Sequence, residues 1–191
     1  FAKSVNNKKW MAKSLNTQGI SFYYRSDYDK AIDYYTRSLK IREEMGDKKG
    51  IALSLGNIGV VYNDQGNHIK SIEYQTKSLK IREELGNKYG IGSSLNNIGL
   101  IYQDHGDQVK AMEYFNNSLI IFEELGNKTC IAISLNNIGR IYNEKGDHVK
   151  AIEYFIRCLK IYEELANKNG IATSLNNIGS IYVNELDQVK A

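Results

Sequence analysis

The chain has 191 residues, a net charge of +3, 42% hydrophobic residues and 25% charged residues. This is the composition of a folded protein, and no apolar run approaches the ~20 residues that a membrane-spanning helix requires. The positive charges are spread along the chain, whereas nucleic-acid-binding proteins usually gather theirs into a basic patch. We therefore expect neither a membrane nor a nucleic acid as a partner.

The cysteines and the chain ends give expectations about compartment and completeness. Cys130 and Cys158 share no spacing that is typical of a metal site or a disulfide framework. We interpret them as free thiols in a reducing compartment and expect a cytoplasmic protein. The chain opens at Phe1 without the apolar stretch of a signal peptide and stops within a repeat at Ala191, so we expect it to be a piece of a longer protein.

One hexapeptide recurs at a regular distance. Ser-Leu-Asn-Asn-Ile-Gly stands at 94–99, 134–139 and 174–179, with a near copy at 54–59 and a degenerate copy at 14–19. Each copy starts forty residues after the previous one, and such a period is typical of an array of supersecondary units that bury their core between neighbours. We expect a single array over 1–191, made of repeats 1–46, 47–86, 87–126 and 127–166 and a partial repeat 167–191.

Glycine followed by Asp or Asn marks the expected turns. These pairs recur every twenty residues from Gly46-Asp47 to Gly146-Asp147. Glycine past a helix end adopts the left-handed conformation, and Asp or Asn then caps the next helix. With no proline in the chain, the predicted helices span 8–25, 28–45, 48–65, 68–85, 88–105, 108–125, 128–145, 148–165 and 168–186, and a tenth begins at Asp187. Turns this short make neighbouring helices antiparallel.

Within each expected hairpin, apolar residues recur at helical spacing. The first helix of the fourth repeat would bury Leu135, Ile138, Gly139 and Tyr142. A glycine inside a helix costs about 1 kcal/mol against alanine, so we expect Gly139 to lie where another backbone approaches closely. In the second helix, Cys158 takes the position of Ser38, Ser78 and Ser118, which predicts a buried site for a small side chain.

The spacing of several residues resembles a known family. The tetratricopeptide repeat has glycine, tyrosine, glycine, alanine, phenylalanine and a small residue at fixed spacing. In this chain the same spacing is found in Gly99, Tyr102, Gly106, Ala111, Phe115 and Ser118. The resemblance covers the whole chain and implies an all-α, right-handed superhelix of antiparallel helix pairs. Leu95 stands in place of the family's tryptophan and Glu123 in place of a frequent proline. The forty-residue, long-helix form is similar to the repeats of Pins/LGN spindle adaptors, to arrays in bacterial signalling proteins and, more loosely, to those of kinesin light chains.

Motifs for catalysis or metal binding are missing from the sequence. It contains no glycine-rich phosphate loop, no His-Glu-x-x-His and no Cys-x-x-Cys. His68, His105 and His148 are scattered at expected helix ends, and the recurring Glu-Glu pairs lie beside Lys or Arg, as on a solvated helix face. We therefore expect no enzyme activity, no cofactor and no metal.

One face of each first helix lies opposite its apolar stripe. The resemblance implies that the first helices line the concave side of the array, so these residues would form the floor of a groove. They comprise Lys13, Thr17, Ile20 and Tyr24, then Leu53, Asn57, Val60 and Asp64, then Ser93, Asn97, Leu100 and Asp104, then Ile133, Asn137, Arg140 and Glu144, and finally Thr173, Asn177, Ser180 and Asn184. We call Asn57, Asn97, Asn137 and Asn177 the asparagine ladder.

The asparagine ladder is a candidate peptide-binding feature. Each carboxamide offers donors and an acceptor that match an extended peptide backbone, and Leu53, Leu100, Ile133 and Tyr24 would seat side chains. The resemblance to Pins/LGN-like and kinesin-light-chain arrays implies the same use of groove asparagines. An exposed Asn costs about half a kcal/mol in a helix against alanine, so four in register favour a binding role over the alternative of ordinary polar surface. We expect Asn96, Asn136 and Asn176 to bond to a neighbouring helix instead.

We therefore expect a non-catalytic scaffold that binds a peptide segment or helix of another protein. An acidic row of Asp64, Asp104 and Glu144, with Arg140 as the positive groove charge of the middle repeats, favours a ligand with some basic character. One alternative is a regulatory or sensor module of a larger signalling enzyme, a kinase or a caspase-like protease. Another is self-assembly through an open C-terminal end. Trp10 and Gln18 depart from the repeat, so we expect the first repeat to start the array.

Overall fold

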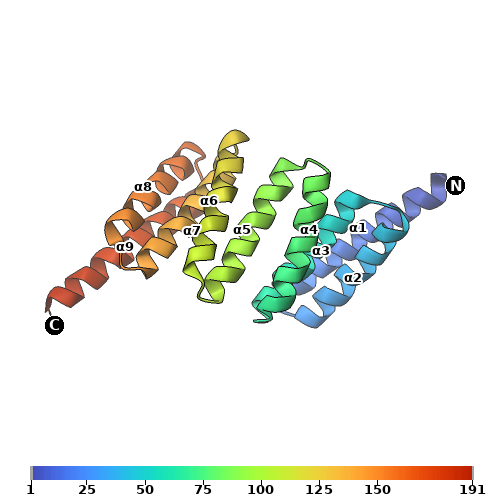
Figure 1. Cartoon of the computed structure of the whole chain (residues 1–191), viewed down its shortest axis with the longest axis horizontal. Helices are drawn as coiled ribbons and strands as arrows, with labels where there is room; N and C mark the ends of the chain where they lie inside the picture. The colour runs from blue at the N-terminus through green and yellow to red at the C-terminus, as the bar shows by residue number, and fades with distance from the viewer. Residues whose placement is uncertain (1, 191) are drawn as a thin grey trace. The chain divides into compact units, whose positions relative to one another are not determined.

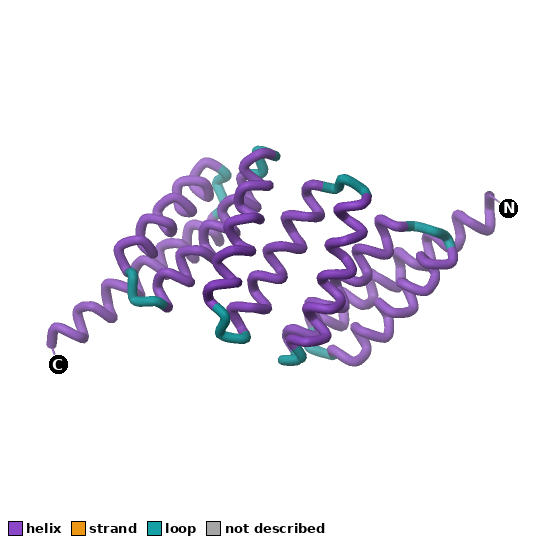
Figure 2. The backbone as a smooth tube through the Cα atoms, viewed as in Figure 1, coloured by secondary structure: helices purple, strands orange, loops and turns teal. Residues whose placement is uncertain are grey.

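The computed structural model describes the backbone of residues 2–190 and the side chains of residues 6–184. Residues 2–190 form nine α-helices joined by short turns, without any strand (Figures 1 and 2). The helices are α1 (Ala2–Tyr24), α2 (Tyr28–Glu44), α3 (Lys48–Asp64), α4 (His68–Glu84), α5 (Lys88–Asp104), α6 (Gln108–Glu124), α7 (Lys128–Glu144), α8 (His148–Glu164) and α9 (Lys168–Lys190). The all-α class predicted from the sequence is confirmed.

The expected helix bounds agree to within one residue except at the two ends of the chain. Helix α1 already begins at Ala2, and α9 continues to Lys190, so the prediction of a separate tenth helix from Asp187 is wrong. Leu186 stands at the position that Gly146 holds one repeat earlier. A leucine adopts the left-handed conformation only at a cost, so the signal that ends the other first helices is missing here.

The turns follow the expected chemistry. Six turn glycines have φ between 61° and 84°, and the same position is held by Ser26 at 58° and Ala166 at 49°. The following Asp or Asn caps the next helix; for example, the side chain of Asp147 accepts a hydrogen bond from the Lys150 backbone N–H at 3.2 Å. Each turn therefore ends one helix and starts the next within three residues.

The chain forms two compact units, residues 1–101 and residues 102–191, whose boundary lies in the last turn of α5. In the first unit α1 packs on α2, α2 on α3 and α3 on α4; in the second, α6 packs on α7, α7 on α8 and α8 on α9. Within each unit consecutive helices run in opposite directions, so the expected antiparallel pairs are present in both units (Figure 1).

The core of each unit lies between its helices and includes an aromatic ring from a second helix. Phe155 of α8 packs with Ala151 and Ile181 in one cluster, and a Cβ atom at Gly139 would meet its ring at 2.7 Å. Gly139 therefore makes room for a side chain of the partner helix. Our prediction of a close backbone approach there is wrong, because the partner places a ring, not its backbone, against the glycine.

Small polar groups tie the second helix of a pair to the first. Ser38 Oγ donates to Ala12 O at 2.8 Å, Ser78 Oγ to Ala52 O at 2.7 Å, and Cys158 Sγ to Ala132 O at 3.2 Å. The prediction of a buried small side chain at 158 is confirmed. Burial raises the pKa of the Cys158 thiol, although a hydrogen bond from Ser174 lowers it in part.

Across the described residues no helix is both long and apolar enough to cross a lipid bilayer. In the same part of the chain, no three His, Cys, Asp or Glu side chains come together in a way that could hold a metal ion.

Candidate functional site

Two adjacent pockets open on the first helices of unit 1. The aromatic pocket has a volume of about 230 Å³ and is lined by Ile20, Tyr23, Tyr24, Tyr35, Asn57 and Val60. The Asp64 pocket has a volume of about 150 Å³ and is lined by Tyr23, Val60, Asn63, Asp64, Ser71, Gln75, Asn97, Leu100 and Ile101. Tyr23 and Val60 belong to both, so the pockets form one continuous surface on α1, α3 and α5, with α2 and α4 behind it.

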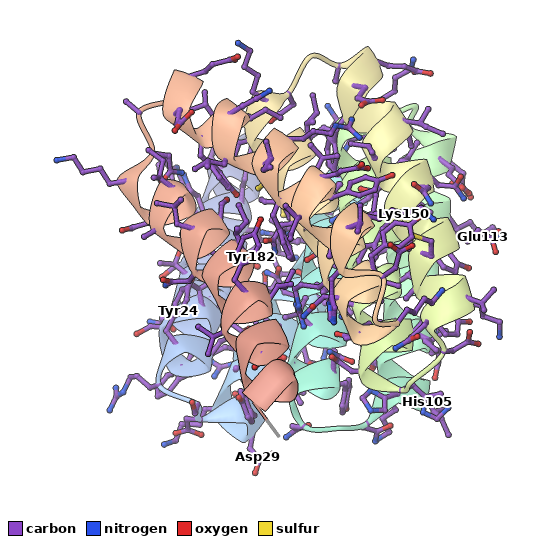
Figure 3. All side chains as sticks on the ribbon, turned by 90° about the vertical axis from the view of Figure 1, so that its left-hand side faces the viewer. Tyr24, Asp29, His105, Glu113, Lys150 and Tyr182 are labelled. Carbon is purple, nitrogen blue, oxygen red and sulfur yellow. The ribbon has the colours of Figure 1, made fainter. Side chains whose placement is uncertain are left out.

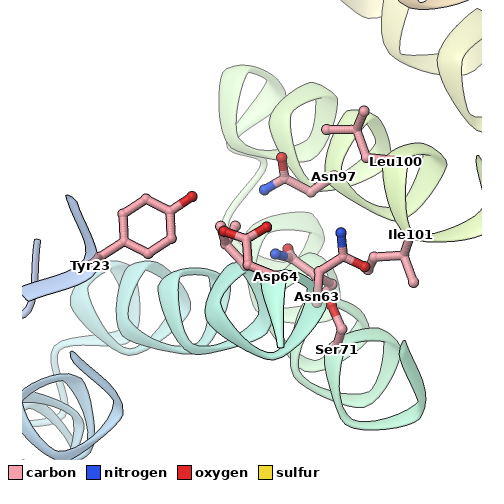
Figure 4. Close-up of a pocket in the computed structure, with 9 residues that line it drawn as sticks. Tyr23, Asn63, Asp64, Ser71, Asn97, Leu100 and Ile101 are labelled. Atoms are coloured by element: carbon pink, nitrogen blue, oxygen red, sulfur yellow. The ribbon is translucent and has the colours of Figure 1, made fainter. Parts of the chain in front are cut away.

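Polar side chains meet at the mouth of the Asp64 pocket. Figure 4 shows Tyr23 from one side and Asn97 from the other, both pointing toward Asp64. Burial raises the pKa of Tyr23, and so does the hydrogen bond that its hydroxyl donates to the Asp64 carboxylate. The exposed carboxylate of Asp64 thus interacts with Tyr23, and the residues that line this pocket include no basic side chain.

Unit 2 carries a related pocket with different charges. The Arg140 pocket has a volume of about 170 Å³ and is lined by Arg140, Asn143, Glu144, Phe155, Asn177 and Ser180. Its Asn143, Glu144 and Asn177 lie eighty residues after Asn63, Asp64 and Asn97, so the same repeat positions build both pockets. Here Arg140 adds a positive charge where unit 1 has Val60.

The asparagine ladder is less exposed than the sequence predicts. Asn57 Nδ2 donates to Asn16 Oδ1 at 3.1 Å, and Asn177 Nδ2 donates to Asn136 Oδ1 at 2.8 Å. These positions lie where one first helix packs on the previous one, so the carboxamides bond between helices. Asn137 is only 5% exposed, and the expectation that it lies on an exposed groove floor is wrong. Asn136 bonds to a neighbouring helix, as predicted.

Asn97 differs from the other ladder residues. It is half-buried in the Asp64 pocket, and across the described residues its side chain makes no hydrogen bond to the protein. Position 56 of α3 is glycine where the first and fourth repeats have Asn16 and Asn136. Because Gly56 offers no side-chain oxygen, the carboxamide of Asn97 remains available for a ligand.

The other predicted groove residues divide between the pockets and the open surface. Tyr24, Asp64, Leu100 and Arg140 line pockets, whereas Leu53 and Ile133 are 42% and 41% exposed and lie outside these three. Glu144 accepts a hydrogen bond from Gln103 Nε2 at 2.6 Å, and Asp104 is exposed.

In the first repeat, two further predicted residues lie in the middle of α1. Lys13 lies 5.5 Å over the ring of Trp10 and lines a hollow with it, and the Thr17 hydroxyl donates to the Lys13 carbonyl at 3.1 Å. Figure 3 labels Tyr24 of α1 and Tyr182 of α9, both of which are exposed at a surface.

Sequence reasoning missed the residues that form the backs of the pockets. Tyr35, Ser71 and Gln75 come from second helices, whereas the sequence predicts that residues of first helices form the groove. The sequence did mark Gln75 as unusual, because the other repeats have an aromatic residue at its position: Tyr35, Phe115 and Phe155.

Two tetratricopeptide repeat family models match the chain, one over residues 50–124 and 130–190 and the other over residues 18–49. The chain therefore belongs to the tetratricopeptide repeat family. No curated protein sequence matches it.

Solved structures share the fold. BtubC (BKLC) from P. vanneervenii is 20% identical with a TM-score of 0.80, over 95% of this chain and 80% of that one. A Rap protein complexed with competence and sporulation factor is 20% identical with a TM-score of 0.80, over 88% of this chain and 51% of that one.

A third protein with a similar structure is longer than the Rap protein. A STAND protein with a tetratricopeptide repeat sensor from Pyrococcus horikoshii is 18% identical with a TM-score of 0.77, over 90% of this chain and 27% of that one. At these identities the likeness shows a helical solenoid fold alone, and this chain spans about half of the Rap protein and about a quarter of the STAND protein.

Proposed function

We propose that this chain is a non-catalytic interaction scaffold that binds a peptide segment or a helix of another protein on the surface formed by its first helices. The observation that carries the proposal is the pair of adjoining pockets on α1, α3 and α5. Together they combine aromatic and aliphatic walls with a few polar groups, which is the usual composition of a site that seats side chains and orients a backbone.

Further arguments support this proposal. Tetratricopeptide repeats are typical of protein–protein interaction, and the Rap structure holds competence and sporulation factor. The long-helix repeat resembles that of Pins/LGN adaptors. Neither Cys130 nor Cys158 forms a disulfide with a described residue, which agrees with a cytoplasmic location.

A second candidate function is a regulatory or sensor module of a larger signalling enzyme. The likeness to the STAND protein favours it, since that protein carries a tetratricopeptide repeat sensor. The two proposals are compatible at the surface itself, because a sensor module also needs a ligand site. Reading the gene on both sides of this chain would decide between them.

The proposal is tested by selecting peptides from a random displayed library on the wild-type chain and measuring their affinities by calorimetry. Val60→Arg should lower the affinity for the selected peptides at least tenfold, because Val60 lines both pockets of unit 1. Ile69→Arg is the matched control, because Ile69 is 84% exposed on α4 and lines neither pocket. Equal losses in both variants, or no loss in Val60→Arg, would contradict the proposed surface.

A further inference from the structure

The second repeat breaks the core pattern at two positions of α4. Alanine stands at 31, 111 and 151, but position 71 is serine; an aromatic ring stands at 35, 115 and 155, but position 75 is glutamine. Both Ser71 and Gln75 are fully buried. Burying a carboxamide in place of a ring costs free energy unless all its hydrogen-bonding groups are satisfied, so this substitution calls for an explanation.

The hydrogen bonds of these two residues leave one acceptor atom without a donor. Ser71 Oγ donates to Gly59 O at 2.6 Å, and Gln75 Nε2 donates to Gly56 O at 2.9 Å. Gln75 Oε1 is buried and has no hydrogen-bond partner among the described residues. A buried acceptor without a donor typically costs about 1–3 kcal/mol, and a donor from a bound group would remove that cost.

Gln75 lies at the back of the Asp64 pocket, whose polar lining combines acceptor oxygens with the donors of the Asn63 and Asn97 carboxamides. The Asp64 carboxylate lies at the mouth, and the carboxamide of Asn97 lies beside it (Figure 4). Val60, Leu100 and Ile101 supply apolar wall between mouth and back. The pocket therefore combines the negative charge of Asp64, the carboxamide of Asn97, the buried carboxamide of Gln75 and an aliphatic lining, and its lining residues include no basic side chain.

We propose that the Asp64 pocket receives the side chain of an arginine from the bound peptide. This inference rests on the proposed function and names the residue that the surface selects. The aliphatic part of the arginine would contact Val60 and Leu100, as long basic side chains do on apolar surface. The guanidinium has five N–H donors in a planar arrangement, which suits acceptors that lie in different directions around it.

The Arg140 pocket of unit 2 gives the reason for assigning the arginine to unit 1. There the place of Gln75 is taken by Phe155, and Arg140 itself supplies a guanidinium where unit 1 has Val60. A second cation would be repelled by Arg140. The two pockets, built from the same repeat positions, thus differ in the charge they accept.

The experiment uses the whole chain and follows the side-chain amide signal of Asn97 and the methyl signals of Leu100 by NMR. N-acetyl-arginine amide is the probe, and N-acetyl-citrulline amide, which has the same shape without the charge, is its control. We expect saturable shifts with arginine and at least tenfold weaker binding of citrulline. N-acetyl-lysine amide should bind more weakly than arginine; tighter binding of lysine would overturn the choice of arginine.

Variants distinguish binding in the Asp64 pocket from nonspecific attraction of the probe to the charge of the protein. Asp64→Asn should weaken arginine binding at least tenfold, whereas Asp33→Asn, the same change at an exposed carboxylate of α2, should leave it unchanged. Gln75→Phe installs the residue of the other repeats and should abolish binding, and Val60→Arg should do the same if Gln75→Phe fails to fold. Arginine binding that survives both pocket variants, or equal binding of citrulline, overturns the inference. Peptides selected on the surface that lack arginine would overturn it while leaving the proposed function standing.

Discussion

The residue at each turn determines how much backbone strain the end of the preceding helix carries. Six turns place glycine in the left-handed region, but the turn after α8 places Ala166 there with φ 49°. The Cβ of an alanine costs about 1 kcal/mol in this conformation. Ala166→Gly should therefore raise the free energy of unfolding by about that amount in chemical denaturation.

The reverse change provides the matched comparison. Gly146 has φ 76°, and a Cβ there would meet no atom within 4 Å, so only backbone strain opposes the substitution. Gly146→Ala should lower the free energy of unfolding by about 1 kcal/mol. If both variants shift stability in the same direction, the strain argument is wrong.

Two glycines at the same repeat position should respond in opposite ways to alanine. At Gly139 the new Cβ would lie 2.7 Å from the buried ring of Phe155, whereas at Gly179 it would meet nothing within 4 Å. Gly139→Ala should cost about 1–3 kcal/mol because a packed ring must move. Gly179→Ala should gain about 0.5–1 kcal/mol from helix propensity.

Thermal unfolding followed by circular dichroism measures both glycine variants. A gain in midpoint temperature for Gly139→Ala would show that the ring of Phe155 is free to shift. A loss for Gly179→Ala would show that its surroundings are more crowded than the structure indicates.

At the scale of the element, one side chain links the end of a second helix to the next first helix. Arg82 of α4 donates to Gly90 O at 2.7 Å and to Ser94 Oγ at 3.0 Å on α5, and burial lowers the pKa of its guanidinium. In unit 2 the ring of Tyr162 covers Gly170 at the equivalent place. Both residues pack over a glycine that starts the next helix.

Truncating this link should destabilise the helix pair. Arg82→Ala removes the packing of a long side chain and leaves Gly90 O without that donor, which we expect to cost about 2 kcal/mol in urea denaturation. Arg82→Tyr should recover part of the loss, because Tyr162 shows that a ring fits over the glycine. A variant Arg82→Tyr less stable than Arg82→Ala would contradict this interpretation.

At the scale of the whole molecule, helix caps make stability depend on pH. Hydrogen bonds and charge from Lys30, Lys110 and Lys150 lower the pKa values of Asp27, Asp107 and Asp147 below the ordinary 3.8. A group whose pKa is lower in the folded state stabilises the protein above its unfolded pKa, and this stabilisation is lost as pH falls through the folded pKa.

The midpoint of thermal unfolding should therefore fall as pH is lowered below about 4. The cap of α7 is Asn127 and does not titrate, so Asp107→Asn should make the acid decline shallower while keeping the cap hydrogen bond to the Lys110 backbone N–H. Titration with circular dichroism at fixed ionic strength checks this. An unchanged acid profile in Asp107→Asn would assign the decline to other carboxylates, such as Glu44 and Glu73, whose pKa values are also lowered.

The forty-residue repeat made the helices and the family predictable from sequence, because turn signals and apolar spacing are local and occur several times. Where a copy departed from the pattern, prediction failed: Leu186 replaces the turn glycine, and the helix runs on to Lys190. The sequence also predicted several of the first-helix residues that line pockets, namely Tyr24, Asp64, Asn97, Leu100 and Arg140.

By itself, the sequence determined which residues share a register, and hence that Asn57, Asn97, Asn137 and Asn177 occupy one position of successive helices. Only the tertiary structure decided what each does. Contact between consecutive first helices turns Asn57 and Asn177 toward Asn16 and Asn136, whereas Gly56 leaves Asn97 open to the pocket. The physical reason is that a repeat specifies positions, while hydrogen bonding depends on which residue the neighbouring repeat places opposite each of them.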